Sequence, residues 1–511
     1  MTLGKNLLAG LASSLWSALL GLAVVPLYLR YLGLEAYGLI GFFAMTQAML
    51  QILDLGLAPT INREVARCSA TGDLKQAGRL LHTLAIIYWC VAAVITLLVV
   101  ALAPLISGYW LTSSHLPQAT VTHAVMLMGL VVACRWPIGL YLGALMGAQR
   151  ITTSSAVSIA MVTLGQLGAV AVLMWVSSTI EAFFLWQAGV GLVHALVMRW
   201  AAWRTVGRPD TRRFDREALK RVWRFSAGMG GVAVSALIFT QLDKVILSKM
   251  LSLADFGAYA LATVVVNGLY VFINPLFSVV YPRFSALVAS NSPEKLAELY
   301  CLSTRILGAM LFPIAMVLAV FAEELVRVWT GDAGIAARVA PVISLLAIGS
   351  ALHGAMYLPY ALQLAYGLTR LPLTINAILM VVQVPLMVYF ALNYGALGGA
   401  MAWLVLHVLY LLLGTWMTHR RLLKWIGFKW LLQDVGLPLL VAAVVGMFAH
   451  YAIQRAEYAI YTKLLVAGAL ALLTSIICVA LSPSLRALVL TRLRRKTKST
   501  TPRLNLPDDT A

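Results

Sequence analysis

The stretch LGLEAYGLIGFFAMTQAM at residues 32–49 is partly repeated as LSLADFGAYALATVVVNG at residues 251–268, an offset of 219 positions. The corresponding residues in this pair are Leu32/Leu251, Leu34/Leu253, Tyr37/Phe256 and Gly38/Gly257. A second pair, GLYLGALMGAQR at 139–150 and PYALQLAYGLTR at 359–370, matches at an offset of 220. Two matches at nearly the same offset predict a chain made of two halves with similar folds.

The composition predicts that both halves lie in a membrane. Of the 511 residues, 61% are hydrophobic and 11% are charged, whereas a soluble domain carries about 25% charged residues. This excludes a soluble enzyme and a nucleic-acid-binding domain, and the apolar content excludes a disordered chain. A helix crosses the hydrocarbon core with about 20 apolar residues, so a chain of this length can cross many times.

Apolar runs bounded by charged residues predict fourteen membrane-spanning helices. They cover residues 7–29, 38–61, 80–106, 121–147, 153–176, 181–200, 225–248, 257–282, 304–322, 339–364, 373–391, 400–417, 431–453 and 461–482. Six spans in each half give both halves the same orientation, a plan that some transporters use with the site between the halves. The predicted fold class is an all-α polytopic membrane protein with two six-helix lobes related by a pseudo-twofold axis, plus two C-terminal helices.

The repeat and the charges predict the domain divisions. These are an N-terminal lobe at 1–200, a basic cytoplasmic linker at 201–224, a C-terminal lobe at 225–418, helices 13 and 14 at 419–482, and a basic, disordered tail at 483–511. An even number of spans places both termini on one side, and that side holds 30 of the 38 Lys+Arg. Because basic residues accumulate on the cytoplasmic side, both termini are predicted to be cytoplasmic. The net charge of +19 then reflects topology.

The sequence contains none of the common enzyme motifs, such as HExxH, GxSxG or GxxxxGK[ST]. The eight histidines show no metal-ligand spacing, and the five cysteines form no CxxC pair. We therefore expect a protein that is not an enzyme and that holds no cofactor or metal.

Arg135 is the clearest candidate for a functional charge inside the membrane. It lies about 20 Å into the span 121–147, at 1.5 Å per residue, and a charge at that depth is costly. It shares a helical face with Gly139, Gly143 and Met146, and glycines at this spacing mark a helix-packing face. We expect Arg135 to point into the protein and favour a functional role; a structural arginine bound to carbonyls or a carboxylate is the alternative.

Polar residues form stripes, at spacings of three or four, on equivalent spans of the two halves. The stripes are Gln47, Gln51, Asp54 and Ala58 in span 2, Asn267, Tyr270, Asn274, Ser278 and Tyr281 in span 8, and Ser350, His353, Tyr357 and Tyr360 in span 10. Unpaired polar groups are costly in a bilayer. Hydrogen bonds between helices would satisfy them, but because both halves carry stripes we favour a shared, water-filled cavity.

Three further charges lie at the outer ends of equivalent spans. Asp243 and Lys244 are adjacent near the end of span 7, and Arg30 occupies the matching end of span 1. Such residues more often anchor a helix by extending toward water than form a site. A functional role is the alternative.

The run PLYLRYLGLEAYGLIGFFAMTQAMLQILDLGLAPTINREVAR at 26–67 resembles the start of the Wzx-type polysaccharide flippases, members of the multidrug/oligosaccharidyl-lipid/polysaccharide exporter superfamily. The likeness rests on LG-x-E-x-YG at 32–38, LDLGL at 53–57, NRE at 62–64, GAQR at 147–150 and QLDKVILSKMLSLADFGAYALA at 241–262. The resemblance implies that the protein moves an undecaprenyl-diphosphate-linked oligosaccharide across the bacterial inner membrane by alternating access, for O-antigen, capsule or exopolysaccharide synthesis.

The resemblance also implies the partners and the site. The partners are the lipid-linked oligosaccharide, the phospholipid bilayer, H+ or Na+ as a coupling ion and other membrane proteins of polysaccharide assembly, with no nucleic acid. Arginine can hold a diphosphate through two parallel hydrogen bonds, which assigns the diphosphate to Arg135. The further substrate contacts are Arg30, Lys244, Gln47, Gln51, Asn267, Tyr270, Asn274 and Tyr357, and the ion-coupling candidates are Asp54 and Asp243.

Two other classes of function stay open. A multidrug-type cation exporter of the same superfamily would use membrane carboxylates such as Asp54 and Asp434, although the motifs favour the saccharide. A membrane-embedded glycan polymerase or glycosyltransferase needs a catalytic loop outside the membrane. The longest outer loop, at 107–120, is short for that role.

Overall fold

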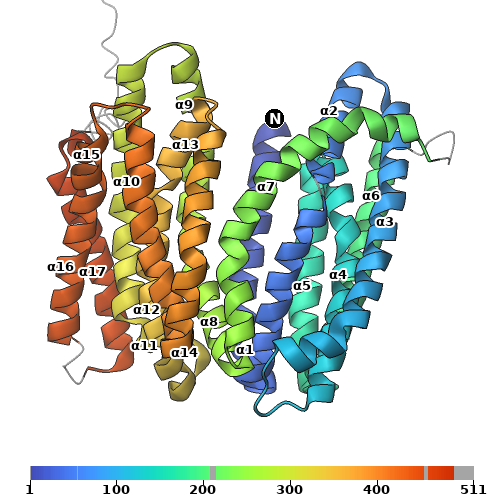
Figure 1. Cartoon of the computed structure of the whole chain (residues 1–511), viewed down its shortest axis with the longest axis horizontal. Helices are drawn as coiled ribbons and strands as arrows, with labels where there is room; N and C mark the ends of the chain where they lie inside the picture. Colours follow the sequence, from blue (N-terminus) through green and yellow to red (C-terminus); the bar gives the residue numbers. More distant parts are fainter. Residues whose placement is uncertain (1, 55, 208–213, 454–457, 488–511) are drawn as a thin grey trace, which may run out of the picture. The chain divides into compact units, whose positions relative to one another are not determined.

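The computed structural model describes the whole chain except residues 1, 55, 208–213, 454–457 and 488–511. Figure 1 shows helices joined by short connections, and in the described part the one strand-type pairing is a single bridge between Thr112 and Ser252. Eleven helices of that part are long and apolar enough to cross a membrane. The predicted all-α polytopic membrane protein is confirmed, whereas the count of fourteen spans stays a prediction.

The helices follow one another along almost the entire chain. The first seven are α1 (Thr2–Leu50), α2 (Leu57–Thr71), α3 (Leu74–Leu105), α4 (Gln118–Gly147), α5 (Ile151–Trp175), α6 (Ile180–Val206) and α7 (Arg216–Met250). The next are α8 (Leu253–Val266), α9 (Tyr270–Ala289), α10 (Pro293–Val320), α11 (Ala322–Thr330), α12 (Ala333–Ala355), α13 (Tyr357–Ala365) and α14 (Arg370–His419). The last are α15 (Gly427–Lys429), α16 (Leu437–Ile453) and α17 (Ile460–Leu481).

Two of these helices are long enough for two crossings each. α1 has 49 residues and α14 has 50, so at 1.5 Å per residue each exceeds twice the hydrocarbon thickness of about 30 Å. Each is kinked at a glycine with positive φ, 79° at Gly33 and 59° at Gly395. A side chain with Cβ is strained there. The kinks fall between predicted spans, after residue 29 and after residue 391.

The predicted span 38–61 is not one continuous helix. α1 ends at Leu50, a 3-10 turn follows at Gln51–Asp54, and α2 begins after Gly56, whose φ is 76°. A left-handed glycine interrupts the α-helical hydrogen-bond pattern. Hydrophobicity did not reveal this break because both sides of it are apolar.

The chain forms two compact units that interleave in sequence. Unit 1 contains Met1–Val265, Val326–Val342 and Asn376–Ala402. Unit 2 contains Val266–Leu325, Ile343–Ile375 and Trp403–Ala511. The lobe, linker and tail boundaries expected from the repeat stay predictions. Of the expected linker and tail, residues 208–213 and 488–511 lie outside the described residues.

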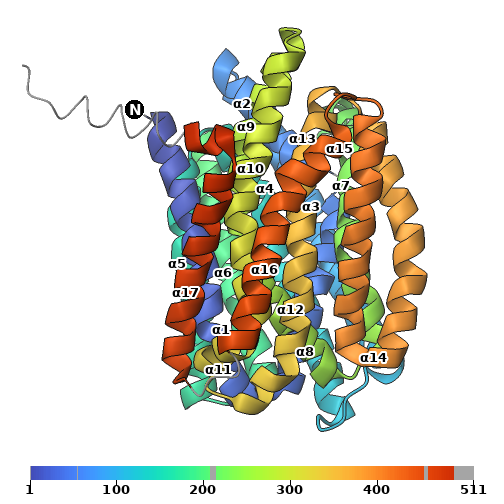
Figure 2. The same cartoon turned by 90° about the vertical axis from the view of Figure 1, so that its left-hand side faces the viewer.

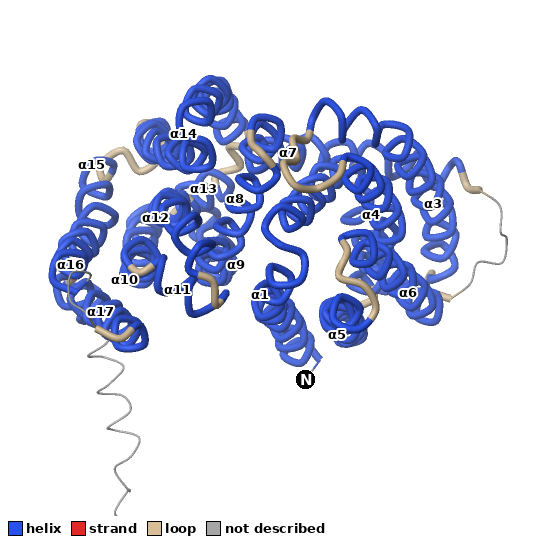
Figure 3. Tube along the Cα trace, turned by 90° about the horizontal axis from the view of Figure 1, so that it is seen from below, coloured by secondary structure: helices blue, strands red, loops and turns tan. Residues whose placement is uncertain are grey.

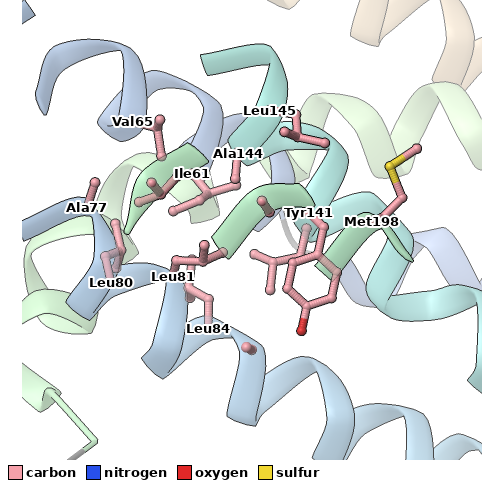
Figure 4. Close-up of a cluster of buried hydrophobic side chains, with 14 of the residues drawn as sticks. Ile61, Val65, Ala77, Leu80, Leu81, Leu84, Tyr141, Ala144, Leu145 and Met198 are labelled. Carbon is pink, nitrogen blue, oxygen red and sulfur yellow. The ribbon is translucent and has the colours of Figure 1, made fainter. Parts of the chain in front are cut away.

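A core of unit 1 lies between α2, α3, α4 and α6, three of which are seen end-on in Figure 3. The buried side chains drawn in Figure 4 include Ile61, Leu81, Tyr141 and Met198. α4 approaches the α2 backbone so closely that a Cβ at Gly143 would lie 2.6 Å from the carbonyl oxygen of Ala58. The predicted packing face of α4 is therefore correct at Gly143. It does not extend to Gly139, where a Cβ would have nothing within 4 Å, or to Met146, which is 42% exposed.

The matched glycines of the repeated motif allow close helix packing within unit 1. A Cβ at Gly38 of α1 would overlap the carbonyl oxygen of Leu253, and a Cβ at Gly257 of α8 would overlap that of Leu34. The two matched glycines therefore bring the α1 and α8 backbones into direct contact. Neither position has space for a side chain.

In unit 2, α16 and α17 pack on α10, and Figure 2 shows these three helices running alongside one another. Arg305 of α10 forms an ion pair with Asp434 of the π-helical turn Trp430–Gly436, with 2.5 Å between Nε and Oδ1. The Trp430 indole stacks on the Tyr300 ring, with 5.4 Å between centroids. These contacts fasten the C-terminal helices to α10.

Candidate binding cavity

A cavity of about 670 Å³ lies inside unit 1, a size typical of small-molecule sites. Its wall is formed by residues of α1 to α7 and of the 3-10 turn after α1. The polar side chains on the wall are Gln47, Gln51, Asp54, Tyr88, Arg135, Gln166, Gln187 and His194. The remaining lining residues are mainly aliphatic, so a few polar groups face one another in an apolar enclosure.

Arg135 of α4 is the cation on this wall. Its Nη2 donates to the Gln187 side-chain oxygen at 2.5 Å, and its Nη1 donates to the Gln47 oxygen at 3.4 Å. Its guanidinium carbon lies 5.6 Å from the centroid of the Phe43 ring, a cation–π distance. Among the residues that the structure describes, no carboxylate forms an ion pair with Arg135.

A glycine on α6 leaves the space that the Arg135 side chain occupies. Gly191 of α6 faces the arginine, and a Cβ there would lie 3.0 Å from the Arg135 Cγ. The glycine allows α6 to approach α4, so that Gln187, one turn earlier on α6, reaches the guanidinium. Arg135 is thus oriented by two neutral amides and an aromatic ring, and its charge is not neutralised by them.

Asp54 lies on the same wall, at the end of the 3-10 turn that precedes α2. Its carboxylate accepts a hydrogen bond from the Tyr88 hydroxyl of α3 and one from the Ala58 backbone N–H at 3.3 Å. An acidic group near a helix N-terminus is stabilised by the exposed N–H groups and the helix dipole. Part of the hydrogen-bonding capacity of the Asp54 carboxylate is therefore used in contacts with α2 and α3.

Sequence reasoning missed several wall residues. Gln187 and Gln166 are single amides within apolar spans 6 and 5, and the rule that singled out Arg135 would have flagged them. Gln166 accepts a hydrogen bond from the Tyr28 hydroxyl at 2.6 Å. The His194 Nε2 atom is buried and has no hydrogen-bond partner among the described residues.

The other predicted charges do not line this cavity. Arg30 is exposed, with its guanidinium 6.0 Å from the centroid of the neighbouring Tyr31 ring. Asp243 is 1% exposed and accepts hydrogen bonds from the Tyr259 hydroxyl at 2.8 Å and from Lys244 Nζ at 3.2 Å. Asp243 and Lys244 thus form a paired cluster within unit 1.

The predicted polar residues of spans 8 and 10 meet in unit 2. The Tyr270 ring lies 6.1 Å from the Tyr357 ring, and its hydroxyl is hydrogen-bonded to His353 Nδ1 at 2.6 Å. Asn267, in the 3-10 turn before α9, and Asn274 of α9 are exposed. The rings of the two stripes therefore form one cluster, and the two amides lie on the same segment as Tyr270.

Within the described ranges, no three His, Cys, Asp or Glu side chains gather as metal ligands would. The fold and the cavity define a polytopic membrane protein with an interior polar site that contains a charge. Ionisable groups in such positions characterise proteins that move solutes or protons through membranes.

The chain belongs to the polysaccharide biosynthesis protein family, whose model matches residues 3–288. The sequence motifs had indicated this family, and the prediction is confirmed. No curated protein matches the chain in sequence.

Solved structures share the fold at low sequence identity. The lipid II flippase MurJ, in an inward closed conformation, matches with a TM-score of 0.68 and 15% identity, over 94% of this chain and 99% of that one. An inward-facing multidrug resistance MATE family transporter of the MOP superfamily matches with a TM-score of 0.63 and 14% identity, over 79% and 95%. The Vibrio cholerae MATE transporter VcmN, in a bent form, matches with 0.53 and 15%, over 82% and 97%. The predicted likeness to both flippases and multidrug transporters is confirmed at the level of the fold.

Proposed function

We propose that this protein is a flippase that moves an undecaprenyl-diphosphate-linked oligosaccharide across the bacterial inner membrane by alternating access. The family supports a role in polysaccharide synthesis, and the shared fold with a lipid II flippase supports lipid-linked cargo. On this proposal both termini are cytoplasmic, and the protein performs no catalytic step. Its product would supply O-antigen, capsule or exopolysaccharide assembly.

The observation that carries the proposal is that Arg135 is hydrogen-bonded, among the described residues, only to neutral amides. A guanidinium has five N–H donors, and the hydrogen bonds of Arg135 to Gln47 and Gln187 use two of them, both to neutral amides. A desolvated charge without a counter-charge is costly, so the cavity is arranged to receive an anion. A diphosphate matches it, because its oxygens can accept two parallel hydrogen bonds from one guanidinium.

The remaining polar groups take secondary roles in this proposal. Gln47 and Gln51 offer amides to sugar hydroxyls near the diphosphate, and Arg30 and Lys244 are further cationic contacts along the route. Asp54 is the first candidate for coupling to H+ or Na+, since its carboxylate lies on the cavity wall. Asp243 is the second, although Tyr259 and Lys244 already bind it.

An ion-coupled multidrug exporter is the second candidate function. The likeness to MATE transporters and the carboxylate of Asp54 in the cavity favour it. Asp434 does not, because Arg305 pairs with it. Increased drug resistance on overexpression, with unchanged lipid-linked saccharides, would favour this function over the flippase.

The test of the flippase function replaces the chromosomal gene by Arg135→Ala and by Arg135→Lys. Diphosphate-linked polyprenyl saccharides are measured by mass spectrometry, with a sidedness probe on spheroplasts. We expect one repeat unit to accumulate in the cytoplasmic leaflet with Arg135→Ala, and less with Arg135→Lys, which keeps the charge but not the two parallel donors.

The matched control is Arg67→Ala, which removes a surface arginine whose side chain is 51% exposed. Protein abundance in the membrane is measured for all three variants. Normal flipping by Arg135→Ala at normal abundance would exclude the diphosphate role of this residue.

A further inference from the structure

Unit 2 contains a continuous group of aromatic side chains that the cavity in unit 1 does not include. We call five of them the aromatic wall: Tyr270, Phe277, Tyr281, Tyr357 and Tyr360. They belong to α9 and α13, which lie side by side in Figure 1. All five are partly exposed, so each ring keeps an open edge or face.

At the centre of the aromatic wall, Phe277 stacks with two tyrosines. The centroids of Tyr281 and Tyr360 lie 5.8 Å and 6.0 Å from that of Phe277, with interplanar angles of 9° and 17°. Tyr357 meets the Phe277 ring edge-on, at 5.9 Å and 85°. Edge-on and offset-stacked contacts are the favoured geometries for aromatic pairs, so the neighbours hold the rings in place.

Two histidines contact the aromatic wall or each other. His353, which is half-buried, contacts both Tyr270 and Tyr357, at 5.9 Å and 5.4 Å between ring centroids. It also lies 4.7 Å from His407, which is fully buried. The rings are therefore positioned before any ligand arrives, which lowers the entropy cost of binding.

Two amides beside the aromatic wall offer hydrogen bonds. Asn267 and Asn274 are exposed on α9 and the turn before it, and no described residue hydrogen-bonds to either side-chain amide. They lie two helical turns apart, on the face that carries Tyr270 and Tyr281. An exposed amide within the hydrocarbon region would lack partners, so this face requires water or a polar ligand.

We propose that the aromatic wall is a binding surface for an uncharged sugar ring of the cargo. The C–H face of a pyranose packs on an aromatic ring, while its hydroxyls need donors and acceptors at the ring's edge. Tyrosine hydroxyls and asparagine amides beside stacked rings supply both. None of the seven side chains carries a charge, so the surface offers no counter-charge to an acidic sugar.

This inference rests on the proposed function, since it assigns the saccharide part of the same cargo to unit 2. It adds that two different surfaces recognise two parts of the cargo. The charged diphosphate is recognised by Arg135, whereas the aromatic wall selects for neutral rings. A lipid acyl chain is the competing occupant, because aromatic faces also pack on hydrocarbon.

The first experiment separates sugar or water from lipid on this face. Asn274→Cys in the full chain, reconstituted in nanodiscs, is treated with a water-soluble maleimide, which reacts with thiols in water. The control is Leu465→Cys, a 77% exposed apolar position on α17, and the native cysteines set the background. We expect labelling of Asn274→Cys well above that of the control. Equal labelling would mean that lipid covers the face and would overturn the proposal.

The second experiment measures sugar binding by saturation-transfer NMR on the purified full chain. The probes are methyl glucoside, methyl galactoside and methyl N-acetylglucosaminide, with methyl glucuronide as the acidic comparison. We expect transfer to at least one neutral probe and less to the glucuronide. The double variant Tyr281→Leu/Tyr360→Leu should weaken binding about tenfold, as expected for losing two stacking contacts. Tyr389→Leu, a 63% exposed tyrosine outside the aromatic wall, should not.

The outcomes distinguish this inference from the proposed function. No transfer to any neutral probe, or unchanged binding by the double variant, overturns the sugar surface and leaves the flippase test with Arg135→Ala unaffected. Neutral-sugar binding that persists in Arg135→Ala supports the surface, even if that variant still flips its cargo. The double variant must match the natural protein in abundance and gel-filtration profile. If it does not, Tyr360→Leu alone is compared with Tyr360→Phe, which keeps the ring, and equal binding by the two would overturn the proposal.

Discussion

Replacing Gln187 by glutamate should inactivate the cavity without damaging the fold. The Gln187 side-chain oxygen already accepts a hydrogen bond from Arg135 at 2.5 Å. Glutamate has nearly the same shape and keeps an oxygen at that point. The change therefore adds one negative charge beside the guanidinium. The Gln187 amide also donates to the Gly165 carbonyl at 3.4 Å, so the change replaces this long hydrogen bond by two facing oxygens, and membrane abundance must be measured beside transport.

The size of the effect follows from Coulomb's law. Two unit charges about 4 Å apart interact by about 4 kcal/mol at an effective dielectric constant of about 20. A carboxylate paired with Arg135 would lower the attraction of the cavity for a diphosphate by roughly this amount. Because about 1.4 kcal/mol corresponds to a factor of ten, binding should weaken by about 10²–10³-fold. Transport should fall below the level that supports surface polysaccharide.

The assay is complementation of a depleted strain, with lipid-linked saccharides measured by leaflet as for Arg135→Ala. The matched control is Gln76→Glu, since Gln76 accepts a hydrogen bond from the surface Arg67 at 3.3 Å. It makes the same substitution beside another arginine, outside the cavity. We expect normal membrane abundance for both variants and loss of flipping for Gln187→Glu alone. Normal flipping by Gln187→Glu would refute the reasoning that Arg135 must keep an uncompensated charge.

Three further predictions concern packing, a buried ion pair and ion coupling. Gly143→Ala should lower the unfolding free energy by up to about 2 kcal/mol, as measured by thermal unfolding in detergent. Overpacking against α2 costs about 1–3 kcal/mol, and the higher helix propensity of alanine offsets about 1 kcal/mol of that. Arg305→Ala should destabilise the protein by about 3 kcal/mol, since it leaves the carboxylate of Asp434 buried and unpaired, and the melting temperature reports it. Asp54→Asn should make transport independent of the proton or sodium gradient, measured in energised vesicles with each gradient imposed separately.

Each of these variants has a control on the same element or contact. Gly139→Ala is one turn from Gly143, and a Cβ there would have nothing within 4 Å, so it should leave the melting temperature unchanged or raise it. Arg305→Ala combined with Asp434→Asn should recover part of the lost stability, because no buried charge is left unpaired. Tyr88→Phe keeps the Asp54 carboxylate and should retain gradient dependence. The packing prediction would be contradicted by equal melting temperatures for the two glycine variants, and the ion-pair prediction by no recovery in the double variant. Gradient-dependent transport by Asp54→Asn would contradict the coupling prediction.

Much of the fold could be predicted because the bilayer restricts what an apolar chain can do. Runs of about 20 apolar residues form helices there, since every backbone N–H and C=O must be paired within the segment. Hydrophobicity alone missed the break after Leu50, where Gly56 adopts a left-handed conformation between two apolar stretches. It also did not show that Gly38 and Gly257 permit direct backbone contact between α1 and α8.

The candidate site was only half visible in the sequence. Arg135 and Asp54 could be selected because a charge in an apolar span is costly wherever the helix lies. The surroundings of Arg135 could not be predicted in the same way. Gln187 and Phe43 lie beside it, and in the described chain no carboxylate pairs with it. This arrangement depends on helix rotation and spacing to within an ångström or so.

What the sequence by itself determined about this protein is therefore its class: an all-helical membrane chain of the polysaccharide biosynthesis family, with a charge in span 4. That information is local, because hydrophobicity, glycine spacing and family motifs are properties of short segments. The tertiary structure decided which side chains meet, placing Arg135 and Asp54 on one cavity wall in unit 1 and stacking Phe277 with two tyrosines in unit 2. Such contacts join residues far apart in sequence, and their geometry is set by how helices pack, which no segment specifies alone.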